Sequence, residues 1–266
     1  MEMYTKSEIL TEIVSFLTVN PKGIIELLGP TASGKTGLSI ELSEFLDKNI
    51  DQKIEVISVD SRQVFRDCDI SSAKITTEEM QGVPHHGLDL VNPDEPFTVV
   101  QFQRYAFETI EAIQARGNIP VLCGGTMLWL DAISENYVFS EDKAIDPETG
   151  ELAFEKSVEK AEPRWPVFKV GLHWDRAKLY ERINQRAHLQ FDGGMIEETK
   201  MILEKYPTLT NSAFTSFGYQ EIKAYLDGEL SYDEALALNQ KRNRKYAKRQ
   251  LTWWRGRADV NWIDLN

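Results

Sequence analysis

Eight residues near the N-terminus, 29–36, constrain the fold of this chain more than any other segment. They read GPTASGKT and match the pattern G-x-x-x-x-G-K-[ST], whose glycines let backbone N–H groups converge on a phosphate. An apolar run, residues 24–28, precedes them, and apolar residues recur with helical spacing after them. The sequence therefore predicts a strand, a phosphate-binding loop and a helix whose N-terminal dipole strengthens the anion site.

The loop recognises phosphate without specifying the molecule that carries it. A nucleoside triphosphate is the usual occupant, but nothing in the eight residues requires one. In such a loop the lysine reaches the terminal phosphate oxygens and the last hydroxyl reaches Mg²⁺, which makes Thr36 the expected metal ligand. The predicted phosphate-binding residues are Gly29, Pro30, Thr31, Ala32, Ser33, Gly34, Lys35 and Thr36.

Two further apolar runs end in polar residues. Residues 54–59 lead to Asp60, residues 119–123 lead to a Gly-Gly pair and Thr126, and a helix is predicted between them over about 98–116. Alternation of strands and helices predicts an α/β fold with a doubly wound parallel sheet, in which ligands bind beyond the carboxyl ends of the strands. We therefore expect Asp60 and Thr126 on the same rim as the phosphate loop.

Asp60 has two chemically sensible roles at this rim. A strand-end carboxylate beside a phosphate loop can coordinate Mg²⁺, or it can act as a general base. Thr126 can cap the next helix and still contact a ligand, because the two uses are compatible. His85 and His86 are adjacent in an extended segment and point to opposite sides, which favours a structural role over metal binding.

The chain divides into four predicted parts. Residues 1–22 form a helical extension, 23–134 begin the core, 135–165 form a short acid-rich insert, and 166–266 complete the core. The turn signal DPETG predicts a β-hairpin over about 143–156. Further strands are expected at 166–174 and 260–265, and helices at 176–189 and 194–206.

Composition limits the classes to which the protein can belong. The N-terminus carries charges among its first dozen residues and no long apolar run, so we expect neither a signal peptide nor a membrane span. Two widely separated cysteines, Cys68 and Cys123, favour a reducing cytoplasm over a disulfide framework. We expect a cytoplasmic monomer that has no membrane contact.

One basic segment interrupts a chain whose net charge is −12. Residues 241–257 read KRNRKYAKRQLTWWRGR and contain eight lysines and arginines and no acid. Because salt screens charges beyond about 8 Å, a binding partner responds to this local charge more than to the net charge of the chain. Ser231 is a predicted N-cap, so the stretch that follows it reads as one long helix. The helix presents either a solvated basic face or a polyanion-binding surface, and the interleaved Tyr246, Trp253 and Trp254 favour the second interpretation.

Several segments together resemble one enzyme family. Six segments resemble the sequence motifs of the bacterial tRNA dimethylallyltransferases and follow one another in the same order and with approximately the same spacing. They are GPTASGKT, SVDSRQVFRDCDISSAK, GVPHHGLDLVNPDEPFTVVQFQRYA, VLCGGTMLWL, TSFGYQEIKAYLDGELSYDEA and RKYAKRQLTWWRG. The resemblance covers about residues 23–264, except for the acidic stretch. It implies a fold of the P-loop type, in which the loop holds the diphosphate of dimethylallyl diphosphate instead of ATP, with Mg²⁺ held through Thr36.

The resemblance also implies roles for individual residues. Asp60 and Thr126 are the expected catalytic residues: Asp60 matches the base that deprotonates the exocyclic amine of an adenine beside the tRNA anticodon, and Thr126 matches a contact to the tRNA. That adenine must leave its stack to reach the site, which favours an unpaired target in the anticodon stem-loop. The other residues expected to contact tRNA are Ser61, Arg62, Gln63, Gly218, Tyr219, Lys248, Arg249, Gln250 and Arg255.

The insert departs from the family pattern. Family members carry a helical insert after the GGT block, with an arginine-bearing motif that grips the anticodon loop, and this chain has only the short acidic stretch. Three functions therefore stay open: prenyl transfer to tRNA, prenyl transfer to free adenine nucleotides, and phosphorylation of a small molecule. The basic helix favours the first and the short insert favours the second, whereas the third requires an ATP base pocket of which the sequence gives no sign.

Overall fold

The computed structural model describes residues 3–139, 159–207 and 218–266. Its centre is a seven-stranded sheet in which every neighbouring pair is parallel, in the order β1-β9-β8-β2-β5-β3-β4. The strands are β1 (Met3–Tyr4), β2 (Ile24–Leu28), β3 (Ile54–Val59), β4 (His85–His86), β5 (Ile119–Gly124), β8 (Val167–His173) and β9 (Val260–Asp264). The predicted α/β fold with a parallel sheet is confirmed.

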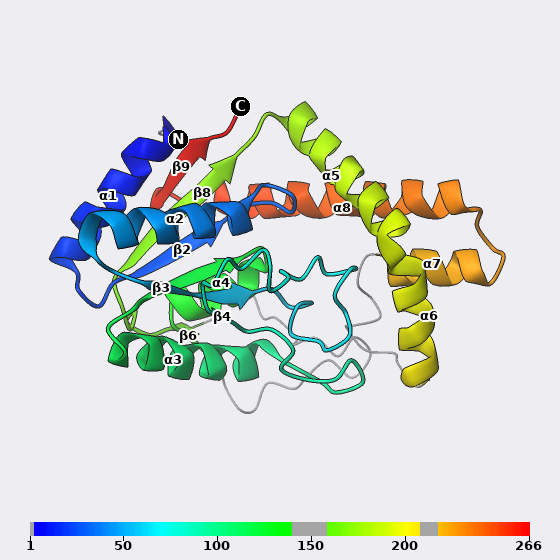
Figure 1. The fold of residues 1–266 in the computed structure, drawn as a ribbon, viewed down its shortest axis with the longest axis horizontal. Coiled ribbons are helices and arrows are strands. Elements are labelled where there is room, and N and C mark those ends of the chain that lie inside the picture. Colours follow the sequence, from blue (N-terminus) through cyan, green and yellow to red (C-terminus); the bar gives the residue numbers. More distant parts are fainter. Residues whose placement is uncertain (1–2, 140–158, 208–217) are drawn as a thin grey trace.

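Helices cover both faces of the sheet and continue beyond it (Figure 1). The helices α1 and α2 lie on one face and α3 and α4 on the other, while α6 and α7 lie beyond the sheet and are linked to it by α5 and α8. Their bounds are α1 (Lys6–Val19), α2 (Lys35–Ile50), α3 (Val99–Ala115), α4 (Met127–Ser134), α5 (Arg176–Gln190), α6 (Ile196–Lys205), α7 (Tyr219–Leu226) and α8 (Tyr232–Trp254), with a π-helical turn at Phe191–Met195. We call α5 to α8 the helical lobe.

The central strands are apolar runs because helices bury them from both sides. All residues of β2 and β3 are buried, with Ile25 and Leu27 facing α1 and α2 while Ile24 and Leu28 face α3 and α4. Strand β5 lies between β2 and β3, so the segments after these three strands meet at one edge of the sheet. This order positions the site.

The first residues belong to the sheet more closely than the expected helical extension suggests. Strand β1 pairs with β9, with Met3 opposite Trp262, and α1 buries Ile9 and Ile13 against the core. Thr5 caps α1 in a reciprocal arrangement with Glu8, as a helix start in this sequence requires. None of the described helices is long and apolar enough to cross a membrane.

The helical lobe is organised by α8, whose predicted start is confirmed. Ser231 accepts a hydrogen bond from the backbone N–H of Glu234, and the Glu234 carboxylate accepts from the backbone N–H of Ser231. Of the expected insert, β6 (Tyr137–Val138) and β7 (Glu159–Lys160) form an antiparallel pair. The hairpin predicted over 143–156 lies outside the described residues. Both Cys68 and Cys123 are free thiols.

Candidate active site

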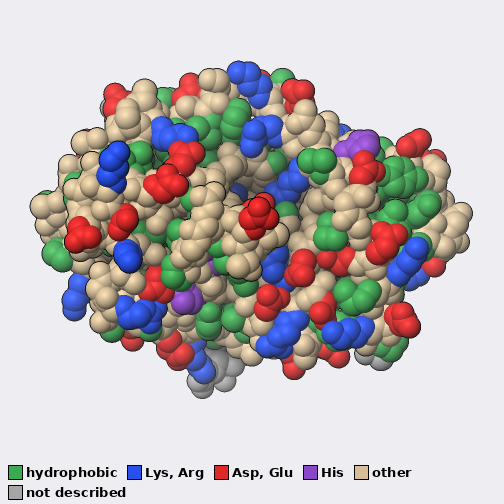
Figure 2. All heavy atoms as spheres, viewed as in Figure 1, with side chains coloured by type: hydrophobic (Ala, Val, Ile, Leu, Met, Phe, Trp, Pro, Cys, Tyr) green, Lys and Arg blue, Asp and Glu red, His purple; other side chains and the backbone are tan. Residues whose placement is uncertain are grey.

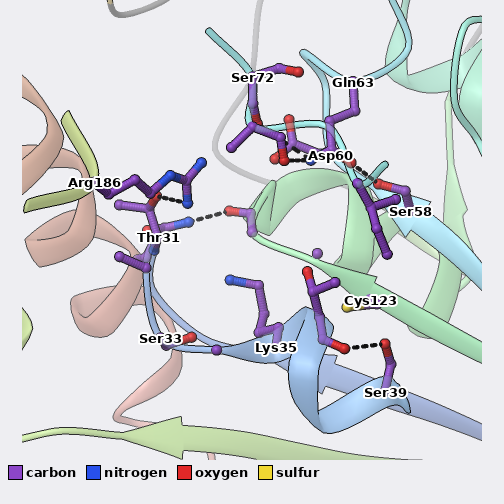
Figure 3. A pocket seen from close by; sticks show the side chains of 18 of the residues that line it. Thr31, Ser33, Lys35, Ser39, Ser58, Asp60, Gln63, Ser72, Cys123 and Arg186 are labelled. Atoms are coloured by element: carbon purple, nitrogen blue, oxygen red, sulfur yellow. Dashed lines mark hydrogen bonds between the residues drawn. The ribbon is translucent and has the colours of Figure 1, made fainter. Parts of the chain in front are cut away.

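A cavity of about 390 Å³ opens at the carboxyl edge of the sheet, where β2, β5 and β3 end next to one another. The phosphate loop contributes one wall, and residues of α5 and α8 contribute another. Figure 3 shows Lys35 pointing into this cavity from the loop, with Asp60 and Arg186 across it. From outside, the same face of the molecule has a central hollow with Lys and Arg side chains in and around it (Figure 2).

The loop has the geometry of an anion site. Gly34 takes a φ of 96°, a left-handed conformation that favours glycine, and the helix α2 starts directly after it. The ammonium group of Lys35 donates to the carbonyl oxygens of Gly29 and Pro30, both at 2.9 Å. The hydroxyl of Ser33 is buried and has no hydrogen-bond partner among the described residues. An anion in the loop would supply such a partner.

The loop is held in place by side chains from distant parts of the chain. Gln250 on α8 accepts a hydrogen bond from the backbone N–H of Thr31 at 2.8 Å and donates to the carbonyl of Gly125 at 2.7 Å. From α5, Arg182 donates to the carbonyl of Ala32 at 2.9 Å. The sheet and the helical lobe therefore fix the loop together.

Two cations inside the cavity make it attractive to anions. Burial lowers the pKa of Lys35 to about 8, against the opposing influence of Cys123 and Asp60, and nearby Arg186 lowers it further. Burial likewise lowers the pKa of Arg186, and Asp60 opposes this shift. Arg186 also donates to the hydroxyl of Thr31 at 3.3 Å. A bound diphosphate would favour the charged form of Lys35 and raise its pKa again.

Asp60 and Thr126 meet at the rim, as the order of the strands requires. One carboxylate oxygen of Asp60 accepts a hydrogen bond from the backbone N–H of Arg62 at 2.9 Å, which orients the carboxylate beside the cavity. The hydroxyl of Thr126 accepts from the backbone N–H of Ser61 at 3.0 Å and so ties the ends of β5 and β3 together. Tyr246 donates to Gly125 at 3.1 Å, and burial together with the charge of Asp60 raises its pKa to about 12. Tyr246 therefore stays a neutral donor next to the carboxylate.

Comparison with known proteins identifies the family. A model described as IPP transferase matches residues 63–160 and 147–257. The chain is 34% identical to a tRNA dimethylallyltransferase from Halothermothrix orenii over 91% of this chain and 88% of the relative. The chain belongs to the tRNA dimethylallyltransferase family. The alignment with that relative spans 293 positions, more than the 266 residues of this chain, so the relative has residues with no counterpart here.

Solved structures of family members share the fold. A tRNA isopentenylpyrophosphate transferase from Bacillus halodurans superimposes with a TM-score of 0.78 at 32% identity, covering 91% of this chain and 90% of that one. The corresponding enzyme from Staphylococcus epidermidis gives 0.75 at 28% identity, covering 91% and 93%. The recognition made from the sequence motifs is confirmed.

The family's expected tRNA contacts fall into two groups in the structure. Gln63 lines the cavity, Ser61 and Arg62 lie in the chain between the lining residues Asp60 and Gln63, and Lys248, Arg249 and Arg255 are exposed on or just after α8. In contrast, the side chains of Gln250 and Tyr219 are each only 1% exposed. The hydroxyl of Tyr219 donates to Glu198 at 2.7 Å, and the backbone N–H of Gly218 donates to Glu221 at 2.8 Å. In this conformation, Gln250 supports the phosphate loop at the wall of the cavity, and Tyr219 supports the helical lobe.

The basic segment is less uniformly charged than its sequence indicates, because acids from other elements reach it. Arg242 forms an ion pair with the fully buried carboxylate of Glu221 at 2.8 Å, and Arg257 pairs with the buried Asp131. No acid of the described residues pairs with the exposed cations Lys241, Lys245, Lys248, Arg249 and Arg255. These five side chains make up the open basic face.

Sequence reasoning missed Arg182 and Arg186. Their spacing of four residues places them on one face of α5, but the same helix also carries Arg176, Lys178 and Glu181, so no local signal showed which face meets the loop. The structural role predicted for the histidine pair fits His86, whose ring lies 2.6 Å from the carboxylate of Glu55. His85 instead lines the cavity.

Metal binding in this cavity would depend on few protein ligands. Within residues 3–139, 159–207 and 218–266, no cluster of three or more His, Cys, Asp or Glu side chains could hold a metal ion. Thr36, which is an exposed residue, and Asp60 both line the cavity. This arrangement fits Mg²⁺, which commonly takes one or two protein oxygens and completes its shell with water and substrate phosphates.

Proposed function

We propose that this protein transfers the dimethylallyl group of dimethylallyl diphosphate to the exocyclic N6 amine of the adenine beside a tRNA anticodon, and releases diphosphate. One observation carries the proposal: the phosphate loop and the carboxylate of Asp60 face the same cavity, and α8 borders that cavity with one side while presenting the open basic face with another. A diphosphate leaving group, a base and a polyanion surface are therefore adjacent.

The chemistry divides between the two sides of the cavity. In the transfer, the bond between the allylic carbon and the diphosphate oxygen breaks and a bond from N6 to that carbon forms. Backbone N–H groups of the loop, together with Lys35 and Arg186, would stabilise the negative charge that develops on the departing diphosphate. Bound Mg²⁺, held through Thr36, would neutralise part of the same charge.

The proton released by the amine goes to Asp60. An aromatic amine is a weak nucleophile, so a base that removes its proton during attack accelerates the reaction by about 10² to 10⁴. The Mg²⁺ role that is open to a strand-end carboxylate is less favoured, because Asp60 is oriented by the backbone N–H of Arg62 across the cavity from the loop. Thr126 positions the segment that carries this base by holding Ser61.

The acceptor in this proposal is a folded tRNA. Several exposed cations on α8 can bind the phosphates of an anticodon stem-loop, and an unpaired adenine can enter the cavity without breaking a base pair. The finer expectations of a monomer and of the cytoplasm belong to the same proposal, and the two free thiols support the second.

Transfer of label distinguishes the possible functions. We would supply labelled dimethylallyl diphosphate and Mg²⁺ with either tRNA or AMP, at low and at moderate salt, and follow the label into each acceptor. Efficient labelling of tRNA that weakens with salt is expected, because each phosphate contact contributes a slope of about −0.7 to −0.9 in log affinity against log salt. Labelling of AMP with little transfer to tRNA at either salt would support a free-nucleotide enzyme instead. A thermal shift by ATP and none by the prenyl diphosphate would support a kinase.

A further inference from the structure

A groove separate from the cavity runs along α8. It is lined by one side of α8, from Arg242 to Trp253, together with Met127 at the start of α4 and Gln220 on α7. Met127 directly follows Thr126 of the rim, and α8 also sends Tyr246 and Gln250 to the cavity. The groove and the cavity are therefore neighbours on the two sides of one helix.

The three aromatic residues of the basic segment differ in how deeply they are buried and in what they face. Trp254 is fully buried in the core, and Tyr246 lines the cavity. Of the three, only Trp253 faces the groove, where its side chain is 42% exposed. Around it in the groove are Lys245, Lys248 and Arg249, for which no acidic partner occurs in the described parts of the chain.

Contacts with Asp131 and Arg257 fix the orientation of the Trp253 indole. Its N–H donates to Asp131 at 2.7 Å, and Asp131 is fully buried and paired with Arg257. The guanidinium of Arg257 also lies 5.9 Å from the centre of the indole ring. A side chain held this way loses little conformational freedom when a flat partner binds to it.

We propose that Trp253 is a stacking platform for a nucleotide base next to the target adenine, positioned by Asp131. The proposal rests on the proposed function and deepens it. When the adenine leaves the loop to enter the cavity, it loses its stacking contacts, and an adjacent base needs a new apolar surface. The groove offers one aromatic face beside Lys245, Lys248 and Arg249, which is the combination that binds single-stranded RNA by stacking and phosphate contact together.

Salt dependence separates stacking from charge. Trp253→Ala should weaken binding of an anticodon stem-loop about five- to 150-fold, the range for loss of one stacked base, and should leave the salt slope unchanged. Lys248→Ala should reduce the slope by about 0.7, because it removes one contact with a single-strand phosphate. Trp253→Phe should keep most of the affinity, and Val19→Ala, a distant exposed apolar truncation on α1, should change neither quantity.

An RNA modification identifies the contact itself. Stem-loops with an abasic site on either side of the target adenine are compared in the wild type and in Trp253→Ala. At one of these positions, the abasic site should lower the affinity of the wild type for the stem-loop but should not lower the affinity of the variant further. The fluorescence of 2-aminopurine placed at the same position should be quenched when the stem-loop binds to the wild type. Wild-type affinity of Trp253→Ala, a reduced salt slope in that variant, or coupling and quenching at neither position would overturn the proposal.

Loss of the fold and loss of the proposed function give different results. Binding of dimethylallyl diphosphate by Trp253→Ala reports whether the variant is folded, and the quenching experiment uses only the wild type. If the wild type does not label tRNA at all, the proposed function fails. If it labels tRNA but shows no coupling at Trp253, only the stacking proposal fails.

Discussion

A buried carboxylate in the central sheet should make the protein less stable as the pH rises. Glu26 on β2 is 1% exposed, and neither carboxylate oxygen accepts a hydrogen bond within the described structure. Its neighbour across the sheet is Lys169, whose ammonium group instead contacts Glu135 at 2.5 Å and Asp259 at 2.7 Å. Burial raises the pKa of Glu26 from 4.5 to about 7, against the charge of Lys169.

The sign and size of the effect follow from this shift. Below about pH 4.5 the carboxyl is protonated in both folded and unfolded chains, so it has no pH-dependent effect. Between 4.5 and 7 the unfolded chain releases the proton and the folded chain keeps it, so stability falls as the pH rises. Above pH 7 the carboxylate is ionised in both states, and its burial lowers the free energy of unfolding by a constant amount of about 3 kcal/mol.

Glu26→Gln should remove this cost because it copies the neutral carboxyl at every pH. The gain in free energy of unfolding should grow from under about 1 kcal/mol at pH 5 to about 3 kcal/mol at pH 8, relative to any constant effect of the amide. For a chain of this size, that growth corresponds to roughly 4–10 °C in Tm.

Urea or thermal denaturation at pH 5, 6, 7 and 8 measures the gain. Glu44→Gln, the same change at an exposed position of α2, serves as the control and should alter stability little. A gain for Glu26→Gln that is the same at every pH would refute the reasoning, since it would mean that Glu26 ionises equally in the folded and unfolded chains.

Three further predictions concern the cavity. Asp60→Asn should abolish prenyl transfer while tRNA binding persists, because the carboxylate moves a proton and does not supply affinity; equal losses in turnover and in binding, measured by filter assay, would point to a positional or metal role. Lys35→Ala should weaken binding of the prenyl diphosphate and have little effect on binding of tRNA. A large loss of tRNA affinity would show that the loop has been assigned the wrong ligand. In the wild type, diphosphate affinity should fall as the pH rises through about 8, as Lys35 loses its proton, and titration calorimetry of Lys35→Ala should lack this dependence.

Most of the fold could be predicted from the sequence because its strongest signals are local. The strand, loop and helix around residues 29–36, the apolar strands and the cap at Ser231 each depend on residues a few positions apart, and the structure contains each of these elements. Strand β1 was missed, since Met3 and Tyr4 are too few to form a periodic pattern and pair only because β9 leaves an open edge. Asp60 lines the cavity at the end of β3, where its place after an apolar strand put it, and Thr126 after β5 contacts the neighbouring Ser61.

The tertiary structure decided which charges and rings are available. The sequence shows that residues 241–257 contain eight basic residues and no acid. In the folded protein, however, Glu221 and Asp131, which lie outside this segment, form ion pairs with Arg242 and Arg257. Likewise, Trp253 and Trp254 are adjacent in the sequence, and only the packing of α8 buries one and exposes the other. The sequence by itself determined the elements and the phosphate loop, because backbone geometry and hydrophobic periodicity act over short distances. Electrostatic pairing and burial act between elements, so the side chains of Arg186, Gln250 and Glu26 acquired their roles only when the chain folded.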